Sequence, residues 1–326
     1  MATNYKVKSK KKGGRRSGVV TLVAFIVAIA LYLTLCALDH FGVQLKFDLG
    51  GFNIFDLFGE KQEVTSSLPV PENVEVMYHF IDVGQGDAIL ITSPDGNILV
   101  DTSVQSARDE LTEYLDAAGV KTIKFLVLTH PDADHIGNAD YVMLNYQVEN
   151  VVLTDHASTS KTYERMLDAI EEKDVNVIIP KPGDEFTLGA LVNTVIAPNR
   201  DYDDPNEMSL VIKSVYGDTS VMLTGDAEVE SERDTCMKWS TSALKSDILK
   251  VGHHGSTTST TDEFLDAVDP KIAIISCGEG NSYGHPHDET VEKLTAKGIT
   301  IYRTDKDGSI IFKTDGKEFT LVETRK

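Results

Sequence analysis

Short apolar runs of strand length recur along the chain from residue 74 onward. In the first half they lie at 74–83, 88–93, 97–102, 124–129, 150–154 and 175–180. Helical patterns lie between some of them, at 107–119 and 161–174. Short runs rich in β-branched residues and bounded by turn residues predict strands that are buried in a sheet.

The second half repeats this style, with helices expected between its strands. The further runs lie at 191–197, 209–217, 219–226, 246–252, 271–276, 300–304 and 309–314. Two strand-rich halves with interspersed helices predict an α/β protein of two packed sheets covered by helices, an αββα sandwich. No period of 20–50 residues is visible in the sequence, which argues against a solenoid.

The beginning of the chain follows another pattern. Residues 1–17 hold seven Lys and Arg and no acid, and the uncharged apolar run 18–38 follows. That run has the roughly 20 residues needed to cross a bilayer, whereas a signal peptide has an apolar core of only about 7–15. We therefore expect one N-terminal transmembrane helix, an uncleaved anchor at 18–38, behind a basic cytoplasmic tail at 1–17.

The remaining residues divide into a linker and a domain. Residues 39–71 carry Gly, Ser and Pro without periodicity and are expected to form a stalk, and 72–326 to form the folded domain. Because basic residues stay on the cytoplasmic side, the expected protein is a single-pass protein of the cell membrane with its domain extracytoplasmic.

Composition adds a strongly acidic character. The chain has 31 basic and 51 acidic residues, a net charge of −20. Without the seven basic residues of the tail, 24 basic against 51 acidic residues give −27. This charge argues against a broad basic surface that binds nucleic acid regardless of sequence, although it does not exclude a local basic groove. Cys36 lies in the expected anchor, and whether Cys236 and Cys277 pair is open.

Candidate chemistry begins directly behind the run 124–129. His130, Asp132, Asp134 and His135 lie there within six consecutive positions. The Pro and Gly around them argue against a regular helix, so we expect a loop at the end of a strand. Histidine with carboxylate is a ligand set for zinc or manganese, and a solvated polar turn is the competing interpretation.

Other strand ends carry similar residues. Asp226 ends the run 219–226, and His253 and His254 follow the run 246–252. A further group follows the run 271–276 and consists of Asn281, Tyr283, His285 and His287. Loops at one edge of a two-layer sandwich converge, so these side chains are expected to line one cleft.

Together these segments resemble a known family. His130, Asp134, His135, Asp226 and the pair His253–His254 are similar to the metal motifs of the metallo-β-lactamase fold. More narrowly, HFIDVGQGDAILI, THPDADH, NEMSLVIKSVYGDTSVMLTGDAE, LKVGHHGS and NSYGHP resemble the hydrolase domain of the ComEC competence proteins, which take up DNA. The resemblance covers about residues 72–324. The many membrane spans of those proteins are absent, so this chain resembles a free-standing relative with one anchor.

The resemblance implies two divalent metal ions, manganese or zinc, with a single ion as the alternative. One site is complete in Asp134, His135, Asp226 and either His253 or His254. The other has His130, Asp132 and the shared Asp226, with Asn206 as a further candidate. Asp132 stands where the wider fold has a histidine, and Asn206 and Ser209 lie where it supplies another. The resulting oxygen-rich site favours manganese over zinc.

The function implied is that of a metal-dependent phosphodiesterase or nuclease that cleaves DNA with a metal-activated water. Asp134 and Asp226 are the expected catalytic carboxylates. His285 or Tyr283 is expected to donate a hydrogen bond or a proton at the leaving or non-bridging oxygen. Lys250 can offer its charge to a phosphate, although a surface lysine with its end in water is the favoured interpretation.

Three expectations concern supporting residues. His79 is expected to be a packed strand residue, and Asp101 a partner of a ligand histidine. Asp82, Gln85 and Asp87 flank a sharp turn whose glycines permit unusual backbone angles, and they are expected to support the metal loop.

Two other functions stay open. One is hydrolysis of another phosphate ester or small molecule, such as a cell-wall polymer, a nucleotide or a lactam, which suits the acidic charge. The other is a non-catalytic, membrane-anchored binding module, against which stands the complete ligand set of one site.

Overall fold

The computed structural model describes residues 61–64, 68, 70 and 74–325. The expected tail at 1–17, the anchor at 18–38 and most of the stalk at 39–71 lie outside the described residues. Among the residues that are described, no helix has both the length and the apolar character needed to cross a membrane.

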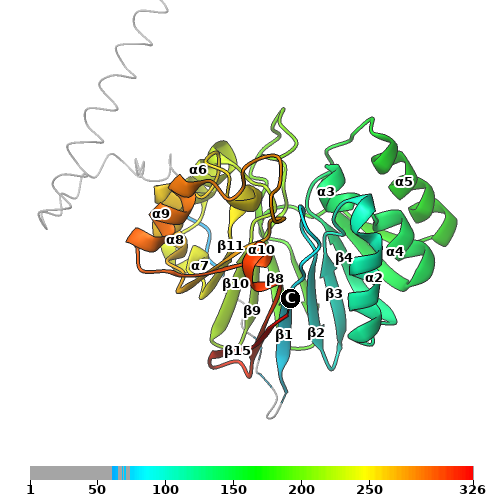
Figure 1. Ribbon diagram of the computed structural model, residues 1–326, viewed down its shortest axis with the longest axis horizontal. Helices are drawn as coiled ribbons and strands as arrows, with labels where there is room; N and C mark the ends of the chain where they lie inside the picture. Colours follow the sequence, from blue (N-terminus) through cyan, green and yellow to red (C-terminus); the bar gives the residue numbers. More distant parts are fainter. Residues whose placement is uncertain (1–60, 65–67, 69, 71–73, 326) are drawn as a thin grey trace, which may run out of the picture. The chain divides into compact units, whose positions relative to one another are not determined.

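Two sheets lie face to face (Figure 1). The first has eight strands among the described residues, in the spatial order β15 (Phe319–Arg325), β14 (Ser309–Thr314), β1 (Val76–Phe80), β2 (Ile89–Ser93), β3 (Gly96–Val100), β4 (Thr122–Leu128), β5 (Gln147–Leu153) and β6 (Asn176–Ile178). The second has seven there, in the order β13 (Thr300–Arg303), β12 (Ile272–Ile275), β11 (Ile248–Lys250), β10 (Thr219–Leu223), β9 (Val211–Tyr216), β8 (Leu191–Ala197) and β7 (Glu185–Leu188).

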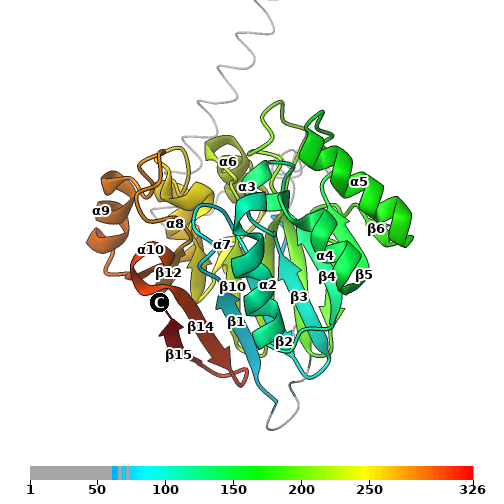
Figure 2. The same cartoon turned by 45° about the vertical axis from the view of Figure 1, so that its right-hand side comes forward.

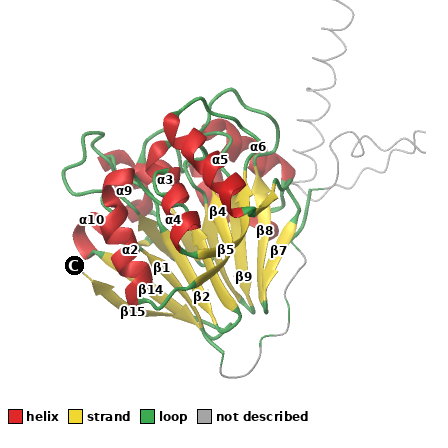
Figure 3. Ribbon diagram, turned by 90° about the vertical axis from the view of Figure 1, so that its right-hand side faces the viewer, coloured by secondary structure: helices red, strands yellow, loops and turns green. Residues whose placement is uncertain are grey.

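Helices cover the outer faces of both sheets, to the left and right of the strands in Figure 1, and Figure 3 shows the helices of the first sheet from the front. Those that follow strands of the first sheet are η2 (Gln105–Ala107), α2 (Arg108–Ala117), α3 (Ala133–Ile136), α4 (Ala139–Asn145) and α5 (Lys161–Lys173). Those of the second half are α6 (Val229–Lys238), α7 (Thr241–Leu244), η3 (Gly252–Gly255), α8 (Asp262–Val268), α9 (Asp288–Ala296) and α10 (Thr304–Asp307). Figure 2 shows α2 and α4 in front of the strands of the first sheet. The predicted αββα sandwich is confirmed.

The alternation of side chains along buried strands produces this layering. In β4, Phe125 and Val127 face the core between the sheets, whereas Leu126 and Leu128 face the helices. Successive side chains of a strand point to opposite faces, so a strand covered on both sides reads as one continuous apolar run. Both helices singled out in the sequence, at 107–119 and 161–174, are present as α2 and α5.

Two strands were not foreseen. β7 has the exposed and buried alternation of a half-buried strand, but it is only four residues long. β15 lies at the edge of its sheet and carries polar residues among its apolar ones, so it gives no continuous run. Short or half-exposed strands give weak periodic signals, which is why both were missed.

Part of the expected stalk contacts the domain. The backbone N–H of Gln62 donates to Lys238 at 2.8 Å, and Gln62 forms a bridge with Trp239. Val64 packs against the core beneath α6 to α9. Residues 61–64 therefore lie with the folded domain and not in a free linker.

The direction of the strands determines where functional loops gather. β3 to β6 are mutually parallel, and so are β10 to β13. In open α/β sheets, sites form at the carboxyl ends of parallel strands. The residues that follow β3, β4, β10 and β11 are Asp101, His130, Asp226 and the His253–His254 pair.

Candidate metal centre

The segment after β4 contains one short helical turn. α3 begins after Asp132, with backbone bonds from His135 and Ile136 to the Asp132 carbonyl, and it ends at Gly137. The expectation of a loop without helix is therefore wrong for Ala133–Ile136. Pro131 and Gly137 bound this segment, as proline and glycine commonly do, but the five residues between them leave room for one helical turn.

The segment after β11 has unusual backbone angles. His253 and His254 adopt φ values of 45° and 54°, in the left-handed region. Each such residue costs about 1–2 kcal/mol unless it is glycine, and such strain clusters at functional sites. Two backbone hydrogen bonds hold the turn, from the N–H of His253 to the Gly225 carbonyl at 3.2 Å and from the N–H of Ser256 to the His253 carbonyl at 2.8 Å.

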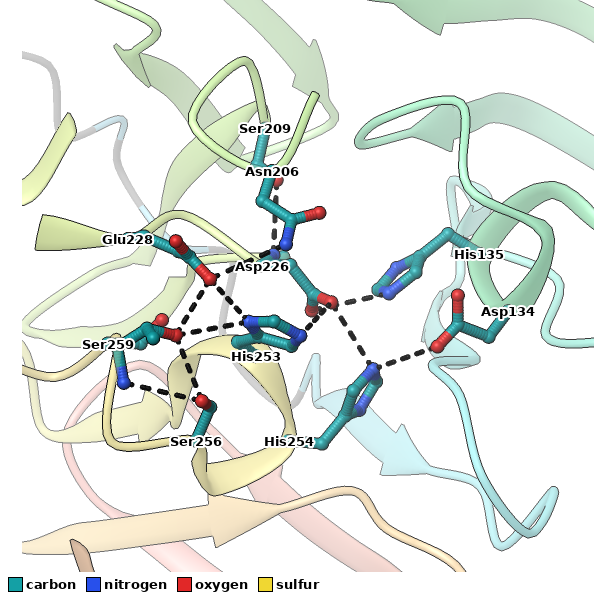
Figure 4. A network of polar contacts seen from close by, with 12 residues as sticks. Asp134, His135, Asn206, Ser209, Asp226, Glu228, His253, His254, Ser256 and Ser259 are labelled. Atoms are coloured by element: carbon teal, nitrogen blue, oxygen red, sulfur yellow. Dashed lines mark hydrogen bonds and ion pairs between the residues drawn. The ribbon is translucent and has the colours of Figure 1, made fainter. Parts of the chain in front are cut away.

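The Asp226 carboxylate is the centre toward which four imidazoles point, and Figure 4 shows those of His135, His253 and His254. It is only 2 % exposed. The distances from the imidazole Nε2 atoms to its oxygens are 3.2 Å for His135, 3.4 Å for His254, 3.7 Å for His253 and 4.0 Å for His130. The Asp134 carboxylate adds a further oxygen, 3.4 Å from Nε2 of His254.

The other ring nitrogen of each histidine contacts a fixed partner. Nδ1 of His135 lies 2.8 Å from the Asp101 carboxylate, and Nδ1 of His254 lies 2.9 Å from the Ser276 carbonyl. Nδ1 of His253 lies 2.7 Å from the Glu228 carboxylate. Nδ1 of His130 lies 3.2 Å from the Thr129 hydroxyl and 3.3 Å from the Ser209 hydroxyl. Such partners orient metal-binding histidines and fix their tautomer. The four rings are thus held with Nε2 toward Asp226.

These side chains fit a divalent cation. Nε2 of His130, His135 and His254 and Oδ1 of Asp226 are buried and form no hydrogen bond of acceptable geometry, although Nε2 of His135 lies close to that oxygen. A buried polar atom without a partner costs about 1–3 kcal/mol. Asp134, His135, Asp226 and His254 each offer one ligand atom, all within 4.8 Å of one another. These four residues correspond to one of the two ligand sets expected from the sequence, and His254 is the member of the histidine pair that lies among them.

Electrostatics couple the carboxylate to the imidazoles. Burial raises the pKa of Asp226, but the positive charges of His135 and His254 and their close contacts with the carboxylate outweigh burial and hold its pKa well below the ordinary value. In turn, burial lowers the pKa of His254, and Asp226 with Asp134 overcomes this and raises it to about 9. Metal binding at such histidines releases protons, because the ligand form is the neutral ring.

Other predicted residues lie around this centre. Asp132 is half-buried, and its pKa is raised by burial and by the neighbouring Asp134. The His285 ring centroid is 5.3 Å from that of His253, and burial lowers the pKa of His285 to about 4. His285 is therefore neutral at pH 7. Tyr283 stacks on it at 5.7 Å and is 65 % exposed.

Lys250 lies in the interior. Its side chain is fully buried, its ammonium is 2.7 Å from an oxygen of Asp87, and it donates to the Val251 carbonyl at 3.0 Å. The favoured expectation of a surface lysine is wrong, because β11 is buried on both faces and its last side chain ends inside the protein. The ammonium points to Asp87 and not to solvent.

The supporting residues behave largely as expected. Asp101 contacts Nδ1 of His135, a candidate ligand histidine, and His79 is packed in β1 with Tyr114 2.9 Å away. In the sharp turn, the backbone N–H of Asp87 donates to the Asp134 carbonyl at 3.1 Å. A Cβ on Gly86 would lie 2.4 Å from that carbonyl oxygen, so this close approach requires glycine.

Two acidic residues were missed by the sequence interpretation. Glu228 contacts His253, and Glu207 accepts three backbone N–H groups at the start of α6. The signal for Glu228 was its place two residues after Asp226 at the same strand end. Asn206, expected as a possible ligand, directs its amide nitrogen toward Glu228 at 3.5 Å.

The chain is similar in sequence to known competence proteins. The chain is 35 % identical over 252 residues to ComE operon protein 3 of Bacillus subtilis, covering 72 % of this chain and 32 % of that protein. It is 31 % identical over 248 residues to competence protein ComA of Neisseria gonorrhoeae, covering 74 % and 33 %. The chain thus spans about one third of the length of these relatives.

The fold has counterparts among solved structures. The metallo-beta-lactamase fold protein YhfI from Bacillus subtilis superimposes with a TM-score of 0.52 at 12 % identity, covering 74 % of this chain and all of that one. The sequence model of the metallo-beta-lactamase superfamily matches residues 81–279, which include all the histidines around Asp226. With its αββα sandwich and its histidines and carboxylates at the strand ends, this chain belongs to the metallo-beta-lactamase superfamily, in which it is homologous to the hydrolase domain of the competence proteins.

Proposed function

We propose that this chain is a metal-dependent phosphodiesterase that cleaves DNA. The observation that carries the proposal is the buried Asp226 carboxylate with four imidazole Nε2 atoms within 4.0 Å. The names of the relatives, competence and recombination proteins, support DNA as the substrate.

The chain's own residues divide into three roles. Asp134, His135, Asp226 and His254 would hold a divalent ion, which when bound lowers the pKa of a water molecule and binds phosphate oxygens. His285, neutral at pH 7, donates a hydrogen bond to a non-bridging or leaving oxygen. Tyr283 presents its exposed ring beside His285, where a base or sugar of the substrate can pack.

Manganese is the proposed ion. The site combines imidazole nitrogens with the oxygens of Asp134 and Asp226, and Asp132 lies in the same loop. Carboxylates favour manganese and magnesium, whereas zinc sites are richer in nitrogen and sulfur ligands.

The test is degradation of plasmid DNA by the purified full-length chain, after chelation and after re-addition of manganese or zinc. Manganese-dependent cleavage that stops with chelator is expected. Binding of DNA without cleavage under every metal condition would instead support a binding module.

A second candidate function is hydrolysis of a smaller phosphate ester. The net charge of −20 favours it, because a long polyanion approaches an acidic protein against repulsion. The same preparations, given a nucleotide, a chromogenic phosphodiester, a teichoic-acid-type polymer and a chromogenic lactam, discriminate the substrates. Turnover of a small ester with intact plasmid would replace DNA as the substrate.

The location belongs to the proposal as well. The charge asymmetry around 18–38 supports a single-pass anchor in the cell membrane, with the N-terminus cytoplasmic and the hydrolase domain extracytoplasmic. A topology reporter fused after Lys326 should be active outside the cytoplasm. Activity only in the cytoplasm would refute this orientation.

A further inference from the structure

We propose that a hollow between β4, β5 and α5 binds one nucleobase of the substrate, beside the phosphate that lies at the metal centre. The inference rests on the proposed cleavage of DNA and adds a recognition site to it. His156 of the segment after β5 and Tyr163 of the first turn of α5 are the residues that contact the base.

The floor of the hollow is apolar. It lies at the carboxyl ends of β4 and β5, which are neighbouring parallel strands, and beside the beginning of α5. Four of its side chains belong to the core beneath the helices of the first sheet, namely Leu128, Ile136, Leu153 and Met166. Such a floor accommodates the face of a planar ring, whereas it offers no polar group to a free phosphate or a metal ion.

Polar side chains form the rim of the hollow. His156 and Tyr163 are half-buried, so part of each ring is open to solvent. The backbone N–H of Tyr163 donates to the hydroxyl of Ser160, the N-cap residue of α5, at 3.1 Å. The backbone N–H of His156 donates to the Thr154 hydroxyl at 3.4 Å. These bonds hold the backbone, whereas within residues 74–325 no hydrogen bond engages the Tyr163 hydroxyl or a ring nitrogen of His156. Both side chains therefore keep polar atoms for a ligand.

The hollow adjoins the metal centre through His130. This ring lines the hollow, and its Nε2 lies 4.0 Å from Oδ2 of Asp226. Pro131, the next residue, also lines the hollow, and Asp132 and Asp134 follow in the same segment. One imidazole ring thus separates the hollow from the central carboxylate, so a nucleoside whose base lies in the hollow places its phosphate at the metal centre.

The hollow and Tyr283 lie on opposite sides of this centre. The backbone N–H of Gly278, after β12, donates to the side chain of Gln85 in the turn after β1 at 3.2 Å. The segment that carries Tyr283 therefore lies toward β1, whereas the hollow lies at β5, on the far side of β4 in the same sheet. Base-packing groups on both sides of one phosphate suit a polynucleotide, because a mononucleotide has only one base to place.

A nucleobase matches both parts of the hollow. Its flat face packs on apolar and aromatic groups, and its edge carries donors and acceptors for the rim. Burial raises the pKa of Tyr163, so its hydroxyl keeps the proton that it can donate. A lipid tail would fill the floor but leave the polar atoms of His156 and Tyr163 without partners.

The first test compares two chromogenic phosphodiesters with the full-length, manganese-loaded chain. One is the nitrophenyl ester of a thymidine phosphate and the other is its abasic analogue, each made with the ester at either end of the sugar. The two share sugar, phosphate and leaving group and differ only in the base. His156→Ala and Tyr163→Ala should each lower kcat/KM for the thymidine ester by roughly 10- to 100-fold, as the loss of one aromatic contact to a base does. The abasic ester should react equally fast in the wild type and both variants.

Tyr141→Ala is the matched control. Tyr141 is a half-buried tyrosine of α4 that does not line the hollow, and its ring packs under Arg108. This variant should hydrolyse both esters like the wild type, and all three variants should bind metal like it. If Tyr163→Ala does not fold, Tyr163→Phe removes only the hydroxyl and should lower kcat/KM for the thymidine ester by roughly 3- to 10-fold.

A second test needs no turnover. On illumination, an iodouracil base forms a covalent bond to an adjacent side chain. A dinucleotide carries this base at one position at a time, and its methylphosphonate linkage resists hydrolysis. From one of the two positions the bond should form at His156 or Tyr163 of the full-length chain, as located by mass spectrometry of its peptides.

Equal losses of kcat/KM for the thymidine and abasic esters overturn the inference, because they assign His156 and Tyr163 a structural role. Full activity of both alanine variants on the thymidine ester overturns it too. Plasmid cleavage by a chain in which iodouracil reacts only at Tyr283 would leave the proposed function standing without the hollow. A bond at Tyr163 in a chain that hydrolyses no phosphodiester would sink the proposed function and leave the hollow a nucleobase site.

Discussion

The carboxylate of Asp101 lies 2.8 Å from Nδ1 of His135, and both side chains are buried almost completely. Asp101 also accepts hydrogen bonds from the backbone N–H and the hydroxyl of Thr129, at 2.8 and 2.7 Å. The loop after β3 thereby orients a histidine supplied by the segment after β4.

Asp101→Asn should weaken metal binding by roughly 10- to 100-fold while the fold remains. The neutral amide lacks the negative charge by which Asp101 makes His135 a stronger metal ligand. Its N–H can also face Nδ1–H of His135, which needs an acceptor. Asparagine suits the φ of 59° at this position, so backbone strain does not confuse the result. Metal titration with a melting curve checks it. Asp155→Asn, at an exposed strand end, is the control, and equal affinities in the two variants would contradict the role assigned to Asp101.

Asp226→Asn should abolish turnover and remove bound metal without unfolding the domain. A carboxylate can give an oxygen to each of two ions, whereas a neutral amide binds hard cations poorly and does not balance their charge. Hydrolysis, bound metal and circular dichroism should be measured on this variant beside His156→Ala and His287→Ala, both of which should retain metal. Retention of metal and activity by Asp226→Asn would rule out the bridging role.

Lys250→Met should lower the free energy of unfolding by roughly 3–5 kcal/mol, because it leaves Asp87 as a buried charge without its partner. Denaturant unfolding of metal-stripped protein measures this. The matched control is Lys271→Met, whose ammonium pairs with Asp247 at 3.0 Å but is 81 % exposed, and which should cost less than about 1 kcal/mol. Similar losses in both variants would mean that the buried pair contributes no more than a surface pair.

Gly86→Ala should disturb the metal centre, whereas Gly84→Ala should not. Both glycines have positive φ, so both substitutions carry backbone strain of about 1–2 kcal/mol. The new Cβ at Gly86 would also lie 2.4 Å from the Asp134 carbonyl and must displace α3, but at Gly84 it meets nothing within 4 Å. Metal affinity should therefore fall only in Gly86→Ala. An equal fall in both would assign the effect to strain alone.

Glu232 should make stability depend on pH. Burial raises its pKa to about 7, although the backbone N–H groups of Thr260 and Thr261 partly oppose this. Between about pH 4.5 and 7 the folded protein keeps this proton while the unfolded chain has lost it, so stability falls as pH rises through that window, by up to about 3 kcal/mol. The free energy of unfolding of the wild type and of Glu232→Gln should be measured from pH 5 to 8, and that of the wild type should fall relative to that of the variant as the pH rises. Parallel pH profiles would show that Glu232 does not titrate there.

The fold and the ligand types were predictable because they depend on local patterns. Continuous apolar runs indicated strands such as β4 and β10, and polar residues at their ends indicated the centre. The partners of these residues were less accessible. No neighbouring residue in the sequence indicates that the Lys250 ammonium pairs with Asp87, or that Glu207 caps a helix that begins more than 20 residues later. These contacts join segments far apart in the chain, and the packing of the two sheets decides them.

Asp134 and His135 follow a strand of the first sheet, whereas Asp226 and His254 follow strands of the second. A cation bound by all four therefore acts as a removable cross-link between the two layers, comparable in its effect on the unfolded chain to a disulfide that closes a long loop. Separation of the layers and release of the ion then become one event, so the free metal concentration sets how often the sandwich opens. Chelation should thus raise hydrogen exchange first in β4 and β10, on both sides of the seam.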